Sequence, residues 1–123
     1  MIDIQNVNKW YGDFHVLKNN STSMEKGEVI VVCGPSGSGK STLLRCINLL
    51  EIPDRGRLFV SGEEVVLKKI RENRTVPADT KQVERIRAKL AMVFQQFNLW
   101  SHMTILQNVI EAPVHVLKIP RQE

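Results

Sequence analysis

The feature that most constrains this chain is a glycine-rich stretch that lies between two apolar segments. Residues 34–41 read GPSGSGKS and fit GxxxxGK(S/T), the pattern of loops that bind phosphate groups. The preceding residues, Val29–Cys33, are apolar and mostly β-branched, which is typical of a strand covered on both faces of a parallel sheet. The following residues, Ser41–Leu50, have the apolar spacing of a helix. A strand, a glycine loop and a helix in this order predict an α/β domain that binds a phosphorylated ligand.

The residue types in this loop suit an anion. Gly37 and Gly39 let the backbone curl so that successive amide N–H groups point at one phosphate, and a side chain at either position would block its approach. Lys40 adds a full positive charge that can reach the β- and γ-phosphates. Ser41 offers a hydroxyl to Mg²⁺, and Thr42 can donate toward the α-phosphate. The predicted phosphate-binding residues are Gly34, Pro35, Ser36, Gly37, Ser38, Gly39, Lys40, Ser41 and Thr42.

The alternative to a phosphate loop is a coincidental turn rich in glycine and serine. It is disfavoured, because the four fixed positions match by chance in only roughly 0.004 of chains of this length. The loop alone does not choose among kinases, GTPases, helicases and transport ATPases. That choice depends on residues outside the loop.

Short strands and turns are predicted before the loop. Ile2, Ile4 and Val7 are spaced roughly as in a half-exposed strand. A turn is expected at 10–13, and Phe14–Leu17 reads as a second short strand.

After the loop, the chain returns to strand signals. The helix over 41–50 is expected to bury one apolar stripe and to end in a turn at 53–56. A strand over Arg57–Val60, a tight turn at Ser61-Gly62 and a returning strand over Glu63–Leu67 follow. The predicted buried stripe of the helix comprises Leu43, Leu44, Ile47 and Leu50.

A polar stretch, a helix and a second apolar strand come next. Residues 68–78 are polar and contain Pro77, so we expect a loop or insertion. Asp79 or Thr80 caps a helix that runs to about Lys89, and Ala91–Phe94 reads as a short apolar strand. The apolar face of the helix is expected to carry Val83, Ile86 and Leu90.

The C-terminal part is predicted to be irregular over Gln95–Met103, with a helix from Thr104 that Pro113 interrupts or ends. The apolar side of this helix carries Ile105, Val109 and Ile110. Phe97, Leu99 and Trp100 leave two readings open. They form either a groove for a partner helix or the core of a small helical lobe.

Length and composition fit one ordinary globular domain, with 123 residues, 42% hydrophobic and 24% charged. The longest apolar run is Val29–Cys33, far short of the ~20 residues of a membrane-spanning helix. Residues 1–4 lack the basic start and apolar core of a secretion signal, so we expect a cytosolic protein. Cys33 and Cys46 are expected to be buried, reduced thiols.

The positive charge is concentrated in one segment. The chain carries 17 basic and 13 acidic residues, a net charge of +4. Residues 68–89 hold eight basic and three acidic residues, so that segment alone is +5. It could form a patch for nucleic acid or anionic headgroups. We favour a solvated insertion and helix face, with no nucleic-acid partner, because no aromatic residues interleave with the charges.

Residues on both sides of the loop resemble the ATP-binding subunits of ABC (ATP-binding cassette) transporters. Tyr11 resembles the aromatic residue that stacks on adenine in that family, and Val16 matches an apolar position that flanks the same base. Met92–Gln95 resembles the family's Q-loop, with Gln95 as its glutamine. The stretches 34–48 and 92–104 are similar to those of importers of polar or basic amino acids, the histidine permease type.

This resemblance implies a fold, cofactors and site roles. The fold is an α/β P-loop NTPase core of the RecA-like type with an N-terminal antiparallel β subdomain. The cofactors are ATP and Mg²⁺, and the activity is ATP hydrolysis coupled to amino acid transport. In the family, Lys40 and Gln95 correspond to catalytic positions, and Ser41 and Gln95 to metal-binding ones.

The resemblance also implies partners and a location. These are transmembrane permease subunits, a second ATPase subunit in a homodimer and, indirectly, a periplasmic or extracellular solute-binding protein. The expected location is cytoplasmic, peripheral on the inner face of the cell membrane.

The chain departs from the family in its extent. The LSGGQ signature, the Walker B strand and the switch histidine are not found, so residues 1–123 are expected to form a partial nucleotide-binding domain, truncated before those regions. A nucleotide-binding module with little or no hydrolysis of its own is therefore the alternative function.

Overall fold

The computed structural model describes residues 1–71 and 74–122. They form two compact units, residues 1–87 and the residues from 88 onward, which are considered separately below. Among the described residues, no helix is both long enough and apolar enough to cross a membrane.

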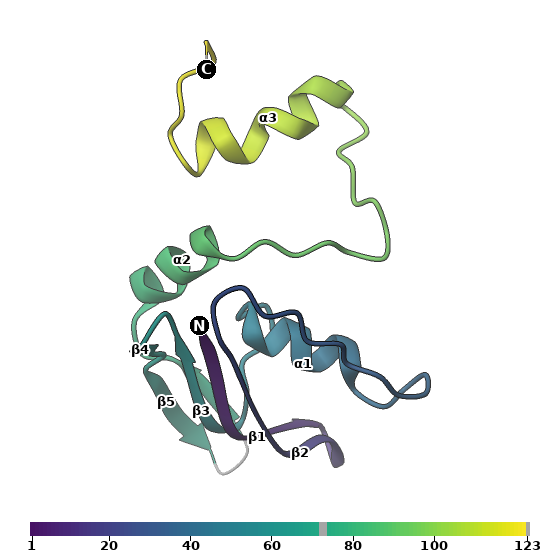
Figure 1. Cartoon of the computed structure of the whole chain (residues 1–123), viewed down its shortest axis with the longest axis vertical. Coiled ribbons are helices and arrows are strands. Elements are labelled where there is room, and N and C mark those ends of the chain that lie inside the picture. Colours follow the sequence, from purple (N-terminus) through teal and green to yellow (C-terminus); the bar gives the residue numbers. More distant parts are fainter. Residues whose placement is uncertain (72–73, 123) are drawn as a thin grey trace. The chain divides into compact units, whose positions relative to one another are not determined.

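The first unit is built on an antiparallel sheet (Figure 1). Its four strands are β1 (Ile2–Tyr11), β2 (Phe14–Met24), β3 (Arg55–Val60) and β4 (Glu63–Glu64), in the order β2-β1-β3-β4. β1 pairs on both sides, with β2 and with β3. The predicted antiparallel β subdomain is thus confirmed, although β2 continues well beyond the predicted end at Leu17.

A bulge in β1 explains the irregular apolar spacing of this strand. Ile4 and Val7 are both buried, although side chains three residues apart point to opposite faces of a regular strand. Asn6, between them, has a φ of 51°, and the register with both neighbouring strands shifts there. The extra residue therefore returns Val7 to the core face.

The helix predicted after the glycine loop is α1 (Lys40–Ile47). It ends at Ile47 rather than at 50, because Leu49 takes a left-handed conformation with φ 59°. Cys46 and Leu49 are the buried side chains of this segment. The buried face of α1 is therefore rotated about the helix axis relative to the predicted apolar stripe, and that prediction was wrong. Leu43 and Ile47 are half-buried, and Leu44 and Leu50 are exposed.

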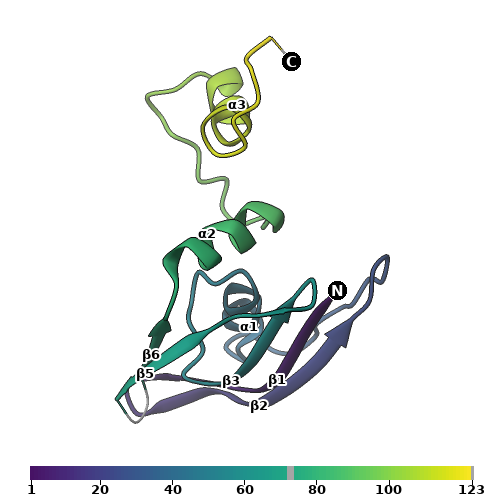
Figure 2. The ribbon, with the colours of Figure 1, turned by 90° about the vertical axis from the view of Figure 1, so that its left-hand side faces the viewer.

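Residues 68–78, predicted as a loop or insertion, contribute to a hairpin rather than to a loop (Figure 2). β5 (Leu67–Arg71) pairs antiparallel with β6 (Arg74–Pro77), and residues 72–73 of the predicted stretch lie outside the described residues. The polar composition misled the prediction because the backbone pairing of a hairpin does not need apolar side chains.

α2 (Thr80–Lys89) confirms the predicted helix, with Val83 and Ile86 buried. Its Gln82 side chain accepts from the Val66 amide at 3.0 Å and donates to the Glu64 carbonyl at 2.8 Å. These bonds attach α2 to the edge of the sheet region. The basic side chains of 68–89 that the structure describes are all exposed, as expected for a solvated face.

The apolar stretch Val29–Cys33, predicted as a buried central strand, is neither a strand nor buried. Val29 is 90% exposed and Val31 is 76% exposed. Cys33 is exposed as well, so the prediction of two buried thiols holds only for Cys46. No described segment pairs with these residues, and an apolar stretch without a hydrogen-bonding partner cannot complete a sheet.

The second unit contains one helix, α3 (Ile105–His115), among its described residues. The helix begins where it was predicted, and Thr104 caps it, because its hydroxyl accepts from the Gln107 amide at 3.1 Å. Pro113 lies inside the helix, so the expected break there was wrong. The predicted strand over 91–94 is irregular in the structure, and Val93 is 96% exposed.

The apolar side of α3 is not buried within its own unit, because Ile105 and Val109 are 79% and 66% exposed. Phe97, Leu99 and Trp100 are also exposed, at 93%, 63% and 50%. These three side chains therefore do not form a core of the second unit, and the first of the two readings, a surface for a partner, stays a prediction.

Candidate functional site

The glycine loop turns tightly before α1. A hydrogen bond of 3.2 Å from the Ser38 amide to the Pro35 carbonyl closes the turn. Gly37 and Gly39 have φ angles of 80° and 94°, a region that residues with a Cβ rarely adopt. The two glycines are therefore required by the backbone itself, whatever ligand the loop binds.

The N-terminus of α1 is open to an anion. Gly39 occupies the N-cap position and provides no side-chain hydrogen bond. The first helical bond runs from the Leu43 amide to the Gly39 carbonyl, at 2.9 Å. The amides of Lys40, Ser41 and Thr42 therefore precede the helical hydrogen-bond ladder, and they carry the positive end of the helix dipole.

The Lys40 side chain folds back over the loop. Its ammonium donates to the Pro35 carbonyl at 2.9 Å and also to the Gly34 carbonyl. The charge is thus held at the loop by two carbonyl oxygens, which phosphate oxygens can replace as acceptors.

Gly39 brings the start of β2 against the loop. A Cβ at this position would meet Val16 Cγ1 and Leu17 Cδ2, each at 3.2 Å. The sequence analysis explained this glycine by the approach of phosphate, but the structure adds a packing reason. It also places Val16, predicted to flank the base, directly beside the loop.

Tyr11, the predicted base platform, lies at the end of β1 and is 44% exposed. The pKa of its hydroxyl is raised by burial and by the Glu51 carboxylate, and a hydrogen bond with Thr42 opposes this shift. Thr42 belongs to the first turn of α1, so the structure brings Tyr11 together with the end of the phosphate loop. The roles of Tyr11 and Val16 in base binding remain predictions.

A charged cluster beside Tyr11 was missed by the sequence analysis. The Lys9 ammonium lies 5.6 Å from the centre of the Tyr11 ring and 3.6 Å from an Asp54 carboxylate oxygen. Asp54 is buried, with only 7% of its surface exposed. The available signal was an acidic residue in the turn at 53–56, which was interpreted only as the end of a helix.

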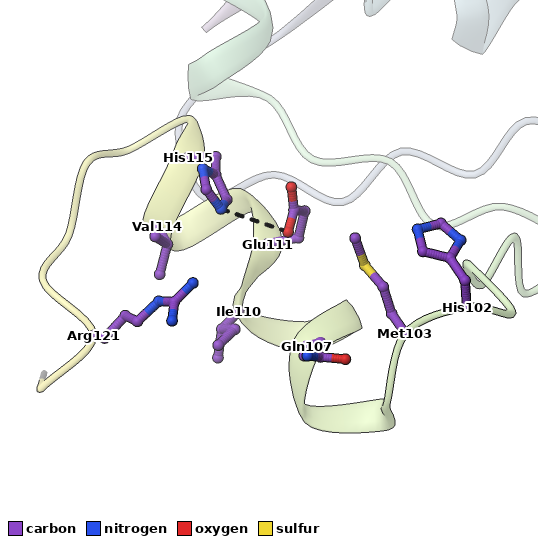
Figure 3. A pocket seen from close by; sticks show the side chains of 8 residues that line it. All are labelled: His102, Met103, Gln107, Ile110, Glu111, Val114, His115 and Arg121. Atoms are coloured by element: carbon purple, nitrogen blue, oxygen red, sulfur yellow. Dashed lines mark ion pairs between the residues drawn. The ribbon is translucent and has the colours of Figure 1, made fainter.

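Gln95, predicted to contact metal and γ-phosphate, lies in the second unit, in an irregular segment, and is exposed. A pocket of about 360 Å³ lies in the same unit, beside α3, and Figure 3 draws the side chains that line it. An ion pair of 3.8 Å joins Glu111 to His115 at its wall. None of the predicted site residues lines this pocket, so it is no part of the predicted nucleotide site.

Comparison with known protein families identifies the chain. The family model described as "ABC transporter" matches residues 17–122, which is most of the sequence. The chain belongs to the ABC transporter family. The resemblance seen in the sequence is therefore confirmed at the level of the family.

Similar curated proteins are transport ATP-binding proteins. The arginine/ornithine transport ATP-binding protein AotP of Pseudomonas aeruginosa is 52% identical over 99% of this ABC chain and 48% of its own length. The octopine permease ATP-binding protein P of Agrobacterium tumefaciens is 53% identical, over 94% of this chain and 44% of its own. HisP of Escherichia coli, a histidine/lysine/arginine/ornithine transport ATP-binding protein, is 47% identical over 99% of this chain and 48% of its own length. The chain thus spans about half the length of these relatives.

Solved structures agree with the family. The dimeric structure of MJ0796, described as a bacterial ABC transporter cassette, matches with a TM-score of 0.77 and 34% identity, over 98% of this chain and 49% of that one. A second structure of MJ0796, described as a post-hydrolysis state bound to ADP and Pi, matches with a TM-score of 0.75 and 32% identity. The described residues therefore have the fold of about half of an ABC cassette.

Proposed function

We propose that this chain is the part of an ABC importer's ATP-binding subunit that binds Mg-ATP. The observation that carries the proposal is the open N-terminus of α1, which follows two glycines with positive φ and has the Lys40 ammonium at the loop. Backbone amides, a helix dipole and an ammonium together make a site for a polyphosphate. These residues fit ATP and its metal ion.

In this proposal each group of the loop has one task. The amides of residues 37–42 and the Lys40 ammonium bind the phosphates and offset their charge. The Ser41 hydroxyl is the predicted ligand of Mg²⁺, which when bound neutralises charge on the β- and γ-phosphates. Gln95 is proposed as a second, exchangeable metal ligand, since its neutral carbonyl can join an oxygen shell and leave it again.

The transported substrate is proposed to be a polar or basic amino acid. Three similar proteins are named for transport of arginine and ornithine, of octopine, and of histidine with basic amino acids. The partners proposed with it are membrane permease subunits, a second ATP-binding subunit and, indirectly, a solute-binding protein. The dimeric cassette of similar fold supports the pairing of two subunits. The proposed location is the cytoplasmic face of the cell membrane.

Whether this chain turns ATP over is a separate question from binding. The alternative is a nucleotide-binding module with little or no hydrolysis of its own, and the chain spans only about half of its relatives. A steady-state assay of phosphate release from Mg-ATP separates the two. Robust turnover that depends on Lys40 supports the ATPase, whereas binding without release supports the module.

The binding site itself is tested by replacing Lys40. Lys40→Ala is expected to lower the affinity for Mg-ATP at least about tenfold, because charge-assisted hydrogen bonds contribute roughly 1.5–3 kcal/mol. Lys81→Ala, which removes an exposed ammonium from α2, is the matched control. Equilibrium binding of Mg-ATP to both variants gives the measurement, and an unchanged affinity of Lys40→Ala would contradict the proposed site.

A further inference from the structure

A charged cluster around the buried Asp54 connects the end of β1 to the turn that follows α1. The Lys9 side chain is only 13% exposed, and its ammonium donates to the Ile52 carbonyl at 2.9 Å. Carboxylate oxygens of Asp54 and Glu51 lie 3.6 and 3.9 Å from the same nitrogen. With acceptors from three residues of the turn around it, the Lys9 ammonium has a fixed position.

Asp54 holds the backbone on both sides of Lys9. Its carboxylate accepts from the Trp10 amide at 2.8 Å. Its own amide donates to the Asn8 carbonyl at 2.9 Å. One buried residue therefore fixes the two peptide groups that flank Lys9, and Tyr11 follows directly after them.

This cluster acts on one face of the Tyr11 ring. The Lys9 ammonium lies over the ring, 5.6 Å from its centre, at a distance where a cation is attracted to the π electrons. Because one face has the cation, a flat ligand can stack only on the other.

We propose that Asp54 and Lys9 are positioning residues of the nucleotide site: they hold Tyr11 so that one ring face is available for an aromatic base. This inference rests on the proposed function, because it concerns the base of the nucleotide whose phosphates the loop binds. It assigns a task to two residues that touch neither the base nor the phosphates. Their effect reaches the ligand through the Tyr11 ring.

The prediction is a split between two ligands. Mg-ATP uses both the base platform and the loop, whereas magnesium tripolyphosphate uses the loop alone. Asp54→Ala is expected to weaken Mg-ATP binding by roughly 5–50-fold, which is within the range measured for loss of a stacked base. Tripolyphosphate binding is expected to change less than about twofold, since the loop and the start of α1 keep their own hydrogen bonds.

Conservative variants separate charge from hydrogen bonding. Asp54→Asn keeps an oxygen that can accept from the Trp10 amide but removes the charge opposite Lys9, so an intermediate loss is expected. Lys9→Met keeps the length of the side chain and removes the cation. Glu84→Gln, which neutralises an exposed acid on α2, is the control for net charge.

The experiment is equilibrium binding of both ligands to each variant, repeated in a Tyr11→Ala background. A selective loss for Mg-ATP that disappears in the Tyr11→Ala background supports the proposal. An equal loss for both ligands indicates a merely structural role, because partial unfolding weakens both alike, and it overturns the proposal. The proposal is also overturned if the loss of Mg-ATP affinity is unchanged in the Tyr11→Ala background, or if the variants lose no Mg-ATP affinity.

Failure of the proposed function has a different signature. If the unmodified chain binds neither ligand, the phosphate site itself is wrong. If it binds Mg-ATP no more tightly than tripolyphosphate, Tyr11 is not a base platform, and the positioning role is overturned with it. If Tyr11→Ala loses Mg-ATP affinity but Asp54→Ala does not, only the inference about Asp54 fails.

Discussion

Two segments of the first unit that carry apolar residues differ in burial and in strand pairing. β1 carries buried Ile4 and Val7 among polar residues and lies between two partner strands. Val29–Cys33 is more apolar and richer in β-branched residues, yet it is exposed and unpaired among the described residues. By propensity alone, the second stretch is the better strand.

The difference shows that strand formation here depends more on available pairing partners than on the composition of the segment. The backbone N–H and C=O groups of β1 bond to β2 and β3, and its apolar side chains pack beneath. Val29–Cys33 has the side chains but no described neighbour to pair with. An apolar segment with an unpaired backbone is also the kind of surface that favours aggregation or a partner.

The largest expected effect is on the free energy of unfolding, and it concerns the packed sheet around β1. Leu58 in β3 is 1% exposed, so Leu58→Ala is expected to lower the free energy of unfolding by roughly 2–5 kcal/mol, from lost burial and the cavity left behind. Val31→Ala, at a side chain 76% exposed, is expected to change it by less than about 0.5 kcal/mol. Denaturant unfolding of both variants measures this contrast. Similar losses for the two variants would show that Val29–Cys33 packs in solution.

A second prediction concerns the bulge in β1. Gly56 has a φ of 105°, and a Cβ there would meet the Asn6 and Gln5 carbonyl oxygens at 2.6 and 2.7 Å. Gly56→Ala is therefore expected to cost roughly 1–3 kcal/mol of unfolding free energy from backbone strain and collision.

The matched control is Gly62, which has a φ of +78° but open space around its Cβ position. Gly62→Ala introduces the backbone strain without a steric clash. Its loss of unfolding free energy is therefore expected to be smaller than that of Gly56→Ala in the same measurement. An equal loss in both variants would show that the bulge can move away from β3.

The two cysteines test the comparison with a chemical probe. Cys33, in the unpaired stretch, is exposed, and Cys46, on α1, is 3% exposed. Burial raises the pKa of the Cys46 thiol to about 11, which also suppresses its reactive thiolate. A thiol reagent at neutral pH is expected to label Cys33 alone in the native chain and both cysteines in denaturant. Protection of Cys33 in the native chain would contradict the exposed conformation.

A further expected effect is a loss of stability at alkaline pH. Since the pKa of Cys46 is raised from 9.0 to about 11, the folded state keeps its proton longer than the unfolded state. The resulting stability is complete below about pH 9 and falls as the pH rises toward 11. Cys46→Ala is expected to remove this part of the decline when unfolding is followed across that range. An identical pH profile in the variant would contradict the assignment.

Prediction from sequence succeeded where the deciding interactions are local. The turn at Ser61-Gly62, the helix start at Thr104 and the glycine loop before α1 depend on residues within a few positions of one another. It failed at the hairpin of β5 and β6, whose pairing the polar composition concealed. It also gave the wrong buried face for α1, since burial there follows contacts with distant strands.

The candidate site divides in the same way. The loop residues were predicted from their motif and Tyr11 from the resemblance to the family, and their roles in ligand binding stay predictions. Lys9 and Asp54 were not predicted, because each is an ordinary charged residue until the fold brings the turn after α1 beside the end of β1. Asp54 stands out from other acidic residues because it is buried, and no spacing rule in the sequence predicts that burial.

The sequence by itself determined the glycine loop, the start of the helix after it and the family, because a motif and a turn depend on residues a few positions apart. The tertiary structure alone decided which apolar stretch becomes a strand, where β1 bulges and which charged residues surround Tyr11. The physical reason is that strand pairing and burial of charge need partners far away along the chain. The composition of a segment cannot supply those partners.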